Sequence, residues 1–317
     1  MKILITGVAG FIGSNFATQF RDKFPQAEIV GLDDLSSGRK DAVPKEVILY
    51  EGSIVDSVLL EKIFSAHKPE YVFHFAAIPR VSYSVQHPVE TTHANVTGTV
   101  AILKTAKDHG VKRVILSSSS SVYGGAKILP TKESENAPDP KSPYAAQKFC
   151  DEIFAKVFSE LYGLDTVCLR YFNVYGPGQY GDSAYSTVIS AWLEALYFPE
   201  AKKAFIEGDG SQSRDFCYVD NVVLANILAM QNEKGFKGEV FNIAHSERKT
   251  VNEIKLMIEE YTGKEIELEK RPARAGDVAH THADISKAKE WFGYEPKVNF
   301  ATGLKKTVEW FEDRKKQ

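Results

Sequence analysis

The chain has 317 residues, of which 43% are hydrophobic, and a formal net charge of -3 at pH 7. This length allows one large α/β unit or two domains with a substantial core. Acidic and basic residues are interspersed, which argues against a nucleic acid or an anionic membrane as the main partner. We expect no signal peptide and no membrane span, because no apolar run is long enough. The three cysteines have no C-x-x-C spacing, as is typical of reduced thiols in the cytoplasm.

A glycine-rich turn follows the first predicted strand, residues 2–6, and precedes a predicted helix, residues 14–24. Gly7, Gly10 and Gly13 allow the turn to tighten and the backbone to approach a pyrophosphate. The free N–H groups at the start of the helix also attract phosphate. This pattern predicts a dinucleotide-binding site.

The second predicted strand, residues 28–32, is followed by Asp33, twenty residues after Gly13. A carboxylate at this position can accept hydrogen bonds from a ribose diol and repels a 2′-phosphate. Asp33 therefore favours NAD over NADP, although the nearby Arg39 and Lys40 leave NADP open.

Strands and helices continue to alternate along the first half of the chain. Further strands are predicted at 47–50, 71–75 and 113–116, and helices at 58–66 and 95–109. This alternation predicts an α/β fold with a doubly wound parallel sheet of the Rossmann type, whose ligands bind outside the carboxyl ends of the strands. Asp33, Ala76-Ala77 and the serines 117–121 would all lie on that edge.

Tyr144 and Lys148 are four residues apart in a predicted helix, 144–163, so they share one helix face. Ser142 suits the helix cap and Pro143 the first helical position. An ammonium beside a phenol favours the phenolate, which predicts a lowered pKa for Tyr144 and a role as general base. Such spacings are common on helix surfaces, and it is the preceding dinucleotide pattern that strengthens this one.

Five serines, residues 117–121, separate an apolar strand from Val122-Tyr123-Gly124. A flexible linker is the alternative interpretation, but linker serines usually come with glycine over longer spans. A hydroxyl in this run could hydrogen-bond the same substrate oxygen as Tyr144.

The composition changes after Pro177. We predict two interleaved parts: a dinucleotide-binding domain, residues 1–176 plus 217–245, and a smaller α/β lobe for the substrate, residues 177–216 plus 246–317. The strand-like residues 239–244 should return to the main sheet, and the substrate should lie in the cleft between the parts. The eight histidines have no spacing typical of metal ligands, so we expect no metal.

With these residues in place, the chain resembles the extended short-chain dehydrogenase/reductases, and among them the UDP-hexose 4-epimerases that act on N-acetylated sugars. The resemblance covers essentially the whole chain. It is carried by the following motifs: Gly7, Gly10 and Gly13, the Asp33 position, His74-Phe75-Ala76-Ala77, Ser117 to Gly124, Tyr144 to Lys148, Leu169 to Pro177, Gly208-Asp209-Gly210 and Arg214-Asp215-Phe216.

The resemblance implies NAD as the cofactor, a UDP-sugar as the substrate, and Ser119, Tyr144 and Lys148 as the catalytic residues. The residues that it implies for the cofactor are Gly7, Gly10, Phe11, Ile12, Gly13, Asp33, Ser53, Ile54, Phe75, Ala76, Ala77, Asn95, Ser117, Tyr144, Lys148 and Tyr171. Asn95 matches a structural or proton-relay asparagine. Ser53 is a departure, since relatives commonly have an acidic residue there against adenine.

For the substrate, the resemblance implies contacts from Ser119, Tyr144, Asn173, Thr187, Val188, Phe205, Arg214, Arg274, Asp277 and Thr281. The two arginines would hold the pyrophosphate and Asp277 the uridine ribose. Phe205 could stack on uracil, although a lone phenylalanine is more often a core residue. The family also implies a homodimer formed through the helices 95–109 and 144–163.

Two positions distinguish members of the family. Related dehydratases have acidic residues where this chain has Ser120 and Ser121, and without an acid the elimination of water lacks its proton donor and base. Thr281 occupies a place where a bulky tyrosine is typical of enzymes restricted to glucose and galactose, so we expect a 2-acetamido group to fit. The alternatives are an epimerase or dehydrogenase for another sugar nucleotide, such as UDP-glucuronate, and a catalytically dead NAD sensor.

Overall fold

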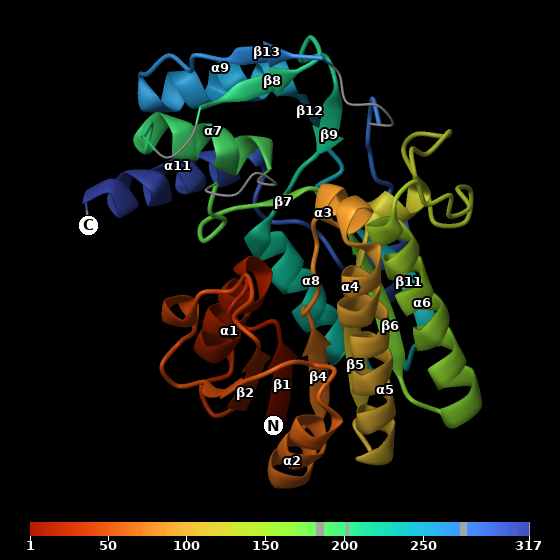
Figure 1. Ribbon diagram of the computed structural model, residues 1–317. Helices are drawn as coiled ribbons and strands as arrows, with labels where there is room; N and C mark the ends of the chain where they lie inside the picture. The colour runs from red at the N-terminus through yellow and green to blue at the C-terminus, as the bar shows by residue number, and fades with distance from the viewer. Residues whose placement is uncertain (182–186, 201–202, 273–277, 317) are drawn as a thin grey trace.

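The computed structural model describes residues 1–181, 187–200, 203–272 and 278–316. Seven parallel strands form the main sheet in the order β11-β6-β5-β4-β1-β2-β3, which confirms the predicted doubly wound fold (Figure 1). Their bounds are β1 Lys2–Thr6, β2 Glu28–Asp33, β3 Ile48–Glu51, β4 Tyr71–His74, β5 Arg113–Ser119, β6 Thr166–Tyr171 and β11 Lys237–Ile243.

The register of the strands brings their carboxyl ends to one edge. Thr6 is aligned with Leu32 on one side and with His74 on the other, so β1, β2 and β4 end together. The strand order reverses between β1 and β4, because the chain crosses from β3 at the edge back to β4. Ligands of doubly wound sheets bind at such a reversal, outside the carboxyl ends.

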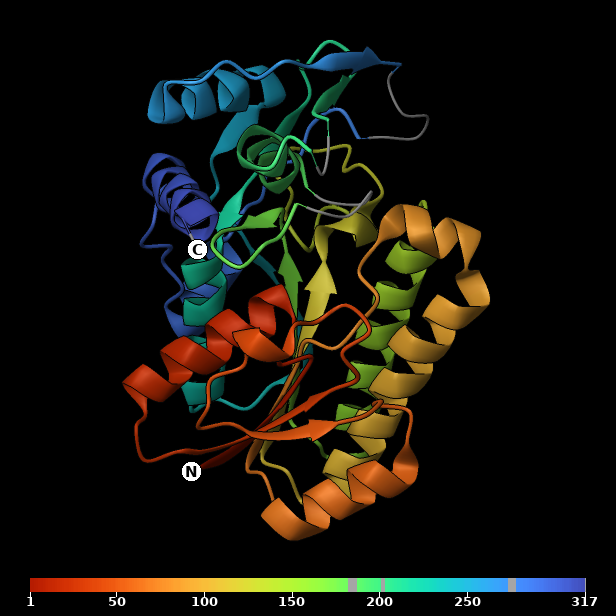
Figure 2. The ribbon, with the colours of Figure 1, turned by 60° about the vertical axis from the view of Figure 1, so that its left-hand side comes forward.

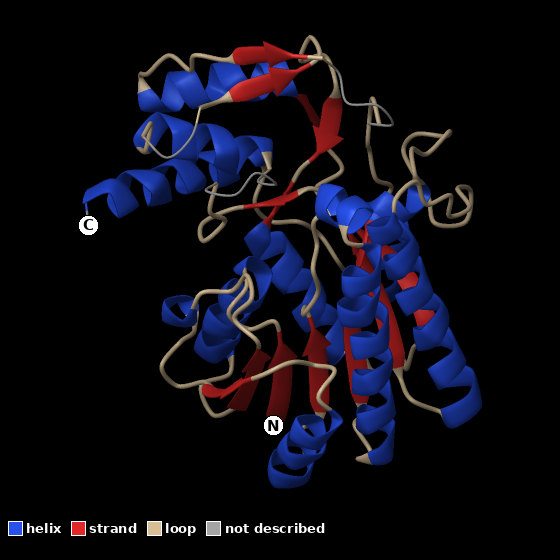
Figure 3. Cartoon of the chain, in the orientation of Figure 1, coloured by secondary structure: helices blue, strands red, loops and turns tan. Residues whose placement is uncertain are grey.

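Helices cover both faces of the main sheet (Figures 2 and 3). One face is covered by α1 Phe11–Lys23, α8 Val219–Gln231 and α10 Ser286–Phe292. The other face is covered by α2 Ser57–His67, α5 Gly98–Asp108 and α6 Pro143–Tyr162. Phe16 and Phe20 of α1 show why these helices dock: they lie one turn apart and both contact Phe73 of β4, with ring centroids 4.3 and 5.8 Å away.

Three further helices, α7 Val188–Tyr197, α9 Val251–Thr262 and α11 Phe300–Lys316, share a separate core beyond the carboxyl edge of the sheet (Figure 1). We call this part of the molecule the second lobe. Its strands are short and pair in twos: β8 Phe205–Glu207 with β13 Glu269–Arg271, and β9 Ser213–Asp215 with β12 Arg248–Thr250. At its junction with the sheet, β7 Val174–Tyr175 pairs with β10 Cys217–Tyr218.

Strand β11 pairs with β6 in parallel, so the predicted return of the chain to the main sheet is confirmed. The predicted domain boundaries stay a prediction. Helix α10 packs on the core of the main sheet, although its residues fall in the range that we assigned to the smaller lobe.

The predicted helix over 95–109 is present, but it starts with a π-helical turn, η2 His93–Thr97, that leads into α5. Two short helices that were not predicted, α3 Val81–Gln86 and α4 Pro88–Thr92, precede it. Pro88 starts α4, since its missing N–H is no loss at a first helical turn. Short 3₁₀ turns also occur at η1 Lys40–Ala42 and η3 Ser120–Tyr123.

The long connection 124–142 has no helix and is tied down by contacts from distant segments. The N–H of Thr131 donates to the carbonyl of His282 (2.7 Å), and the N–H of Asn242 donates to Glu133 Oε1 (2.7 Å). Within the described part of the chain, no helix is both long and apolar enough to cross a membrane.

Candidate active site

Two adjoining cavities lie along the carboxyl edge of the main sheet. One, of about 500 Å³, extends from the glycine turn over β1, β2 and β4. The other, of about 630 Å³, lies between β5, β6 and the second lobe. Tyr144 and Tyr171 line both cavities, which therefore meet at the start of α6.

The glycine turn is built for close approach. A Cβ atom on Gly13 would lie 2.0 Å from the carbonyl oxygen of Gly7, and one on Gly7 would lie 2.6 Å from the nitrogen of Ala76. Gly7 also has a φ of +70°, which other residues rarely adopt. Helix α1 begins at Phe11, so its free N–H groups face the first cavity, as a pyrophosphate requires.

Asp33 forms the far wall of the first cavity at the end of β2. Its carboxylate accepts hydrogen bonds from the N–H groups of Ala9 (2.8 Å) and Leu35 (2.9 Å), and burial raises its pKa. Each carboxylate oxygen has a further lone pair, so the held side chain can still accept from a ribose hydroxyl. These features fit the adenosine half of a dinucleotide.

Arg39, which follows Asp33 in the loop after β2, contacts an acidic and an aromatic side chain. Its guanidinium pairs with Asp41 (3.2 Å) and lies over the ring of Tyr180, 4.4 Å from the centroid. A second cation on that ring is Arg314 of α11, at 4.7 Å, which makes two 2.7 Å hydrogen bonds to Glu194 of α7. We call these residues the Tyr180 clasp. It connects the loop after β2 to the second lobe beside the first cavity.

The predicted cofactor residues come together, with one exception. Those that line the first cavity are Gly7, Gly10, Phe11, Ile12, Gly13, Asp33, Ser53, Ile54, Phe75, Ala76, Ala77, Ser117, Tyr144, Lys148 and Tyr171. Asn95 is not among them. It is buried, accepts the N–H of Ile78 (2.7 Å) and donates to Gln147 Oε1 (2.8 Å), so it fixes the loop that lines the cavity.

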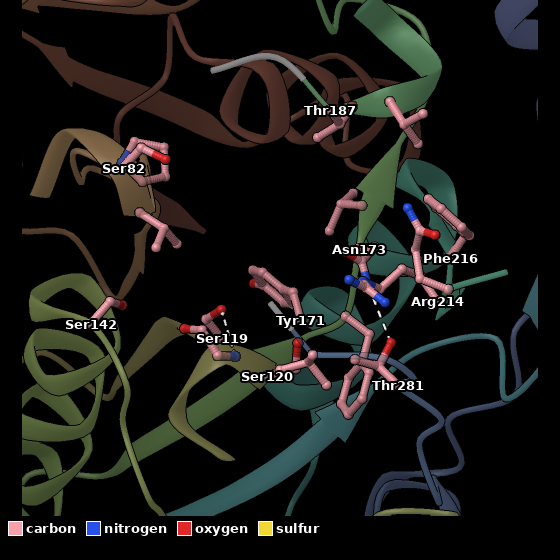
Figure 4. A pocket seen from close by; sticks show the side chains of 18 of the residues that line it. Ser82, Ser119, Ser120, Ser142, Tyr171, Asn173, Thr187, Arg214, Phe216 and Thr281 are labelled. Atoms are coloured by element: carbon pink, nitrogen blue, oxygen red, sulfur yellow. Dashed lines mark hydrogen bonds between the residues drawn. The ribbon is translucent and has the colours of Figure 1, made fainter. Parts of the chain in front are cut away.

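Ser119, Tyr144 and Lys148 meet where the two cavities join. Ser119 ends β5 and accepts the N–H of Ser121 (3.2 Å), and its hydroxyl lies close enough to the Tyr144 phenol to lower the pKa of that phenol. Ser142 caps α6 by accepting the N–H of Ala145 (3.2 Å), as predicted. Figure 4 shows Ser119 and Ser142 on the same side of the substrate cavity.

The pKa of Tyr144 differs from our prediction. Burial raises it above the usual value, while the Lys148 ammonium and the hydrogen bond from Ser119 lower it only in part. The prediction considered only the neighbouring cation, and the sequence did not show that residue Tyr144 is only 8% exposed. Asp151, three residues beyond Lys148 on α6, adds a negative charge that raises this pKa again.

A buried ion pair that was not predicted from the sequence holds the serine run against α6. Arg170 of β6 makes two hydrogen bonds to Glu152 of α6 (2.7 and 2.6 Å), and Ser118 donates to the same carboxylate. The guanidinium also lies over the ring of Tyr123, 4.5 Å from the centroid. This pair therefore fixes β5, β6 and α6 in the register that aligns Ser119 with Tyr144.

Besides Ser119 and Tyr144, the predicted substrate residues that line the second cavity are Asn173, Thr187, Val188, Phe205, Arg214 and Thr281. Figure 4 shows Asn173, Thr187, Arg214 and Thr281 on the side of this cavity opposite Ser142. Asn173 Nδ2 lies 3.5 Å from Thr281 Oγ1, and that hydroxyl accepts the N–H of Asp215 (3.1 Å). The ring of Phe205 lies under the guanidinium of Arg271, 3.9 Å from the centroid. Arg274 and Asp277 lie outside the described residues.

Several lining residues were not predicted. The second cavity is also lined by Arg80, Ser82, Gly125, Lys141, Trp192, Gln212, Phe216 and His280, and the first by Gly178 and Gln179. Most of them come from loops that lack a periodic pattern. Trp192 is the lining residue that the sequence could have indicated, because a buried tryptophan needs a hydrogen-bond acceptor for its indole N–H. In the structure this N–H donates to the carbonyl of Phe205 (2.9 Å).

The glycine turn, the sheet and the serine–tyrosine–lysine group define an NAD-binding enzyme of the short-chain dehydrogenase/reductase class. Residues 3–244 match the NAD dependent epimerase/dehydratase family. The chain belongs to this family, whose cofactor is NAD.

Solved structures and curated relatives support the same family assignment. A UDP-glucose 4-epimerase from Thermotoga maritima, solved with UDP-glucose, is 40% identical, with a TM-score of 0.93 and coverage of 99% of both chains. A UDP-N-acetylglucosamine 4-epimerase from Methanobrevibacter ruminantium, in complex with UDP-N-acetylmuramic acid, is 36% identical, with a TM-score of 0.90 and coverage of 99% and 98%. A UDP-glucuronate 4-epimerase from Thermodesulfobacterium geofontis is 34% identical over 98% of this chain and 96% of the relative.

Proposed function

We propose that the protein is an NAD-dependent 4-epimerase of UDP-hexoses that accepts both plain and N-acetylated sugars. The observation that carries this proposal is the position of Tyr144, which lines the cofactor cavity and the substrate cavity at once. Ser119 and Lys148 stand beside it, and the neighbouring Ser120 and Ser121 offer no acid for the elimination of water. Epimerisation needs no such acid.

The reaction uses one proton-handling group twice. Tyr144 takes the proton of the sugar 4-hydroxyl, with Ser119 hydrogen-bonded to the same oxygen, and later returns it. Bound NAD would supply the acceptor and then the donor of the C4 hydride, and its positive ring would add to the effect of Lys148 on the phenol. Between the two transfers the 4-keto sugar turns about its diphosphate, which Asn173 and Arg214 are placed to hold. The C4 hydrogen thus returns on the opposite face.

Space in the substrate cavity supports the acetamido group. Thr281 is small, and Gly124, Gly125 and Ala126 line the same cavity. We therefore expect turnover of UDP-N-acetylglucosamine as well as UDP-glucose. The assay is incubation with each substrate, and with UDP-glucuronate as a third, without added NAD, followed by separation of the C4 epimers. Turnover of UDP-glucose alone would contradict the acetamido assignment, and turnover of UDP-glucuronate alone would replace it.

A Tyr144→Phe variant distinguishes an enzyme from an NAD sensor. Loss of the phenolic hydroxyl should lower kcat at least about a hundredfold, because proton transfer commonly contributes that much or more. The ring remains, so co-purified NAD should stay at the wild-type level. Unchanged turnover would exclude Tyr144 as the base, and absence of turnover in the wild type with all three sugars would favour the sensor.

The family resemblance and one exposed surface support a homodimer. Val85 of α3, Val89 of α4 and Ile153, Leu161 and Tyr162 of α6 are all exposed. Pairing such faces in a second copy would bury them. Sedimentation analysis tests this state. We also place the protein in the cytoplasm, since Cys150, Cys168 and Cys217 are unpaired thiols, as expected in a reducing compartment.

A further inference from the structure

A second carboxylate stands beside the proposed proton-handling pair. Asp151 follows Lys148 by three residues on α6, and Asp151 Oδ2 lies 3.2 Å from Lys148 Nζ. Both side chains are only 3% exposed. Residues three apart share a helix face, so the contact is built into the sequence of α6. Nothing in the proposed epimerase reaction requires this carboxylate.

Burial of the Asp151–Lys148 pair is unfavourable in free energy, because one oxygen of the carboxylate lacks a hydrogen bond within the described part of the chain. Asp151 Oδ1 is buried and makes no hydrogen bond to the residues that the structure describes. A buried carboxylate with an unsatisfied oxygen is unfavourable unless a close cation compensates it. Lys148 is that cation, so each of the two charges depends on the other.

We propose that Asp151 is a positioning residue that holds the Lys148 ammonium charged and in place, and so sets the pH range in which Tyr144 exchanges protons. The proposal rests on the assignment of Tyr144 and Lys148 as the proton-handling pair. Asp151 itself touches neither substrate nor cofactor cavity.

The charges around the pair point in the same direction. Burial raises the pKa of Asp151 to about 6, and Lys148 opposes this shift. Burial lowers the pKa of Lys148, but the charges of Asp151 and Tyr144 outweigh it, so the net direction is upward. The Asp151 carboxylate also raises the pKa of Tyr144. Asp151 therefore offsets part of the effect that the ammonium has on the phenol.

Other groups that face the pair do not take over this role. The titratable neighbours are Cys150 and Glu152 of α6, Cys168 of β6 and His74 of β4. Burial raises the pKa of both thiols and lowers the pKa of His74 to about 3, so all three stay neutral at pH 7. Glu152 is paired with Arg170. Among the residues that the structure describes, Lys148 and Asp151 are thus the charges that shift the pKa of Tyr144.

The test is Asp151→Asn, which removes the charge and keeps the shape. Without the carboxylate, the pKa values of both Tyr144 and Lys148 should fall. Both limbs of the pH profile of kcat/KM should therefore move to lower pH, by about one unit. The pKa of Tyr144 can also be measured without turnover, by ultraviolet titration of the NAD-loaded protein in the absence of sugar. Subtracting the titration of the same protein carrying Tyr144→Phe isolates the signal of Tyr144. The pKa obtained in this way should be lower in Asp151→Asn than in the wild type, by the same amount as the kinetic limbs.

The titration separates this proposal from the epimerase assignment, since it needs no turnover. Asp108→Asn serves as the matched control, because Asp108 pairs with Lys104 on the surface of α5 and should leave both curves in place. If Asp151→Asn does not fold, Asp151→Ser makes the same test with a smaller neutral side chain. A variant with lowered kcat but unmoved limbs and an unmoved tyrosine titration would overturn the proposal and leave Asp151 a packing residue.

Discussion

Asp215 illustrates how burial of a single residue ties the two parts of the molecule together. It is fully buried at the end of β9 and accepts the N–H groups of Ala283 (3.0 Å) and Ser246 (3.2 Å). These contacts join β9 to the segments that follow β11 and precede α10. Burial raises its pKa from 3.8 to about 7, although the backbone donors oppose the shift.

This shift makes stability depend on pH. The pKa of Asp215 is higher in the folded chain, so its contribution is fully present below pH 3.8 and is lost as the pH rises through about 7. We expect the wild type to lose stability relative to Asp215→Asn over this window, by at most about 1.4 kcal/mol per pH unit. Urea unfolding of both proteins at several pH values measures the difference. A difference that does not change with pH would contradict the raised pKa.

Residue types, rather than residue environments, could be predicted from the sequence. The glycines, Asp33, Ser119, Tyr144 and Lys148 were found because the chemistry of a nucleotide site needs those types at those spacings. Asp151 and Glu152 carry no such pattern, since their importance comes from being buried beside a particular cation. The direction of the Tyr144 pKa shift was missed for the same reason.

At the scale of elements, the start of α6 decides where the proposed base points. Ser142 caps the helix, and the N–H of Tyr144 itself donates to Ser84 Oγ of α3 (3.0 Å). The first turn of α6 is thus held from two sides, by its own cap and by a neighbouring helix. Small losses of order in this turn should displace the phenol from Ser119.

Replacing Ser142 with alanine should therefore reduce both stability and activity. Loss of the cap costs about 1 kcal/mol, and kcat should fall because the phenol is held less firmly. Asp56→Ala is the matched control: Asp56 caps α2 by accepting from Val58 and Leu59 (3.0 Å each) and lines neither cavity. It should lower stability similarly and leave kcat unchanged. Equal kcat losses in the two variants would show that the α6 cap has no special role.

Most elements of the main sheet could be predicted, because their apolar runs and helical faces are local signals. The segment from Val81 to Thr97 could not, since its short helices break at Pro88 and a π-turn replaces a regular start. The paired strands of the second lobe are three residues long or less and join partners far apart in sequence, such as β8 with β13. Such pairings depend on the completed fold.

At the scale of the whole molecule, the Tyr180 clasp holds the cofactor loop against the second lobe. Arg39 and Arg314 approach the same ring from opposite parts of the chain, and Trp310 packs edge-on against it, with centroids 5.2 Å apart. An epimerase regenerates its cofactor in every cycle, so retention of NAD costs no turnover. The clasp suits that requirement.

Tyr180→Ala should therefore release NAD faster. Two cation–π contacts are worth roughly 1–2 kcal/mol together, which corresponds to about a tenfold faster exchange. The measurement is exchange of co-purified NAD against labelled NAD in the absence of sugar. Tyr180→Phe keeps the ring and should exchange at the wild-type rate. If both variants exchange alike, the aromatic ring has no part in retention.

The place of β11 in the main sheet has a consequence for how the protein is made. The strand beside β6 comes from residues 237–243, after the chain has left for the second lobe and returned through α8. During synthesis, one edge of β6 therefore stays unpaired until some seventy further residues, counted from Tyr171 to Ile243, have left the ribosome. A fragment ending at Gly176 would retain the glycine turn and Tyr144, yet would expose the apolar flank of β6 and be prone to aggregate.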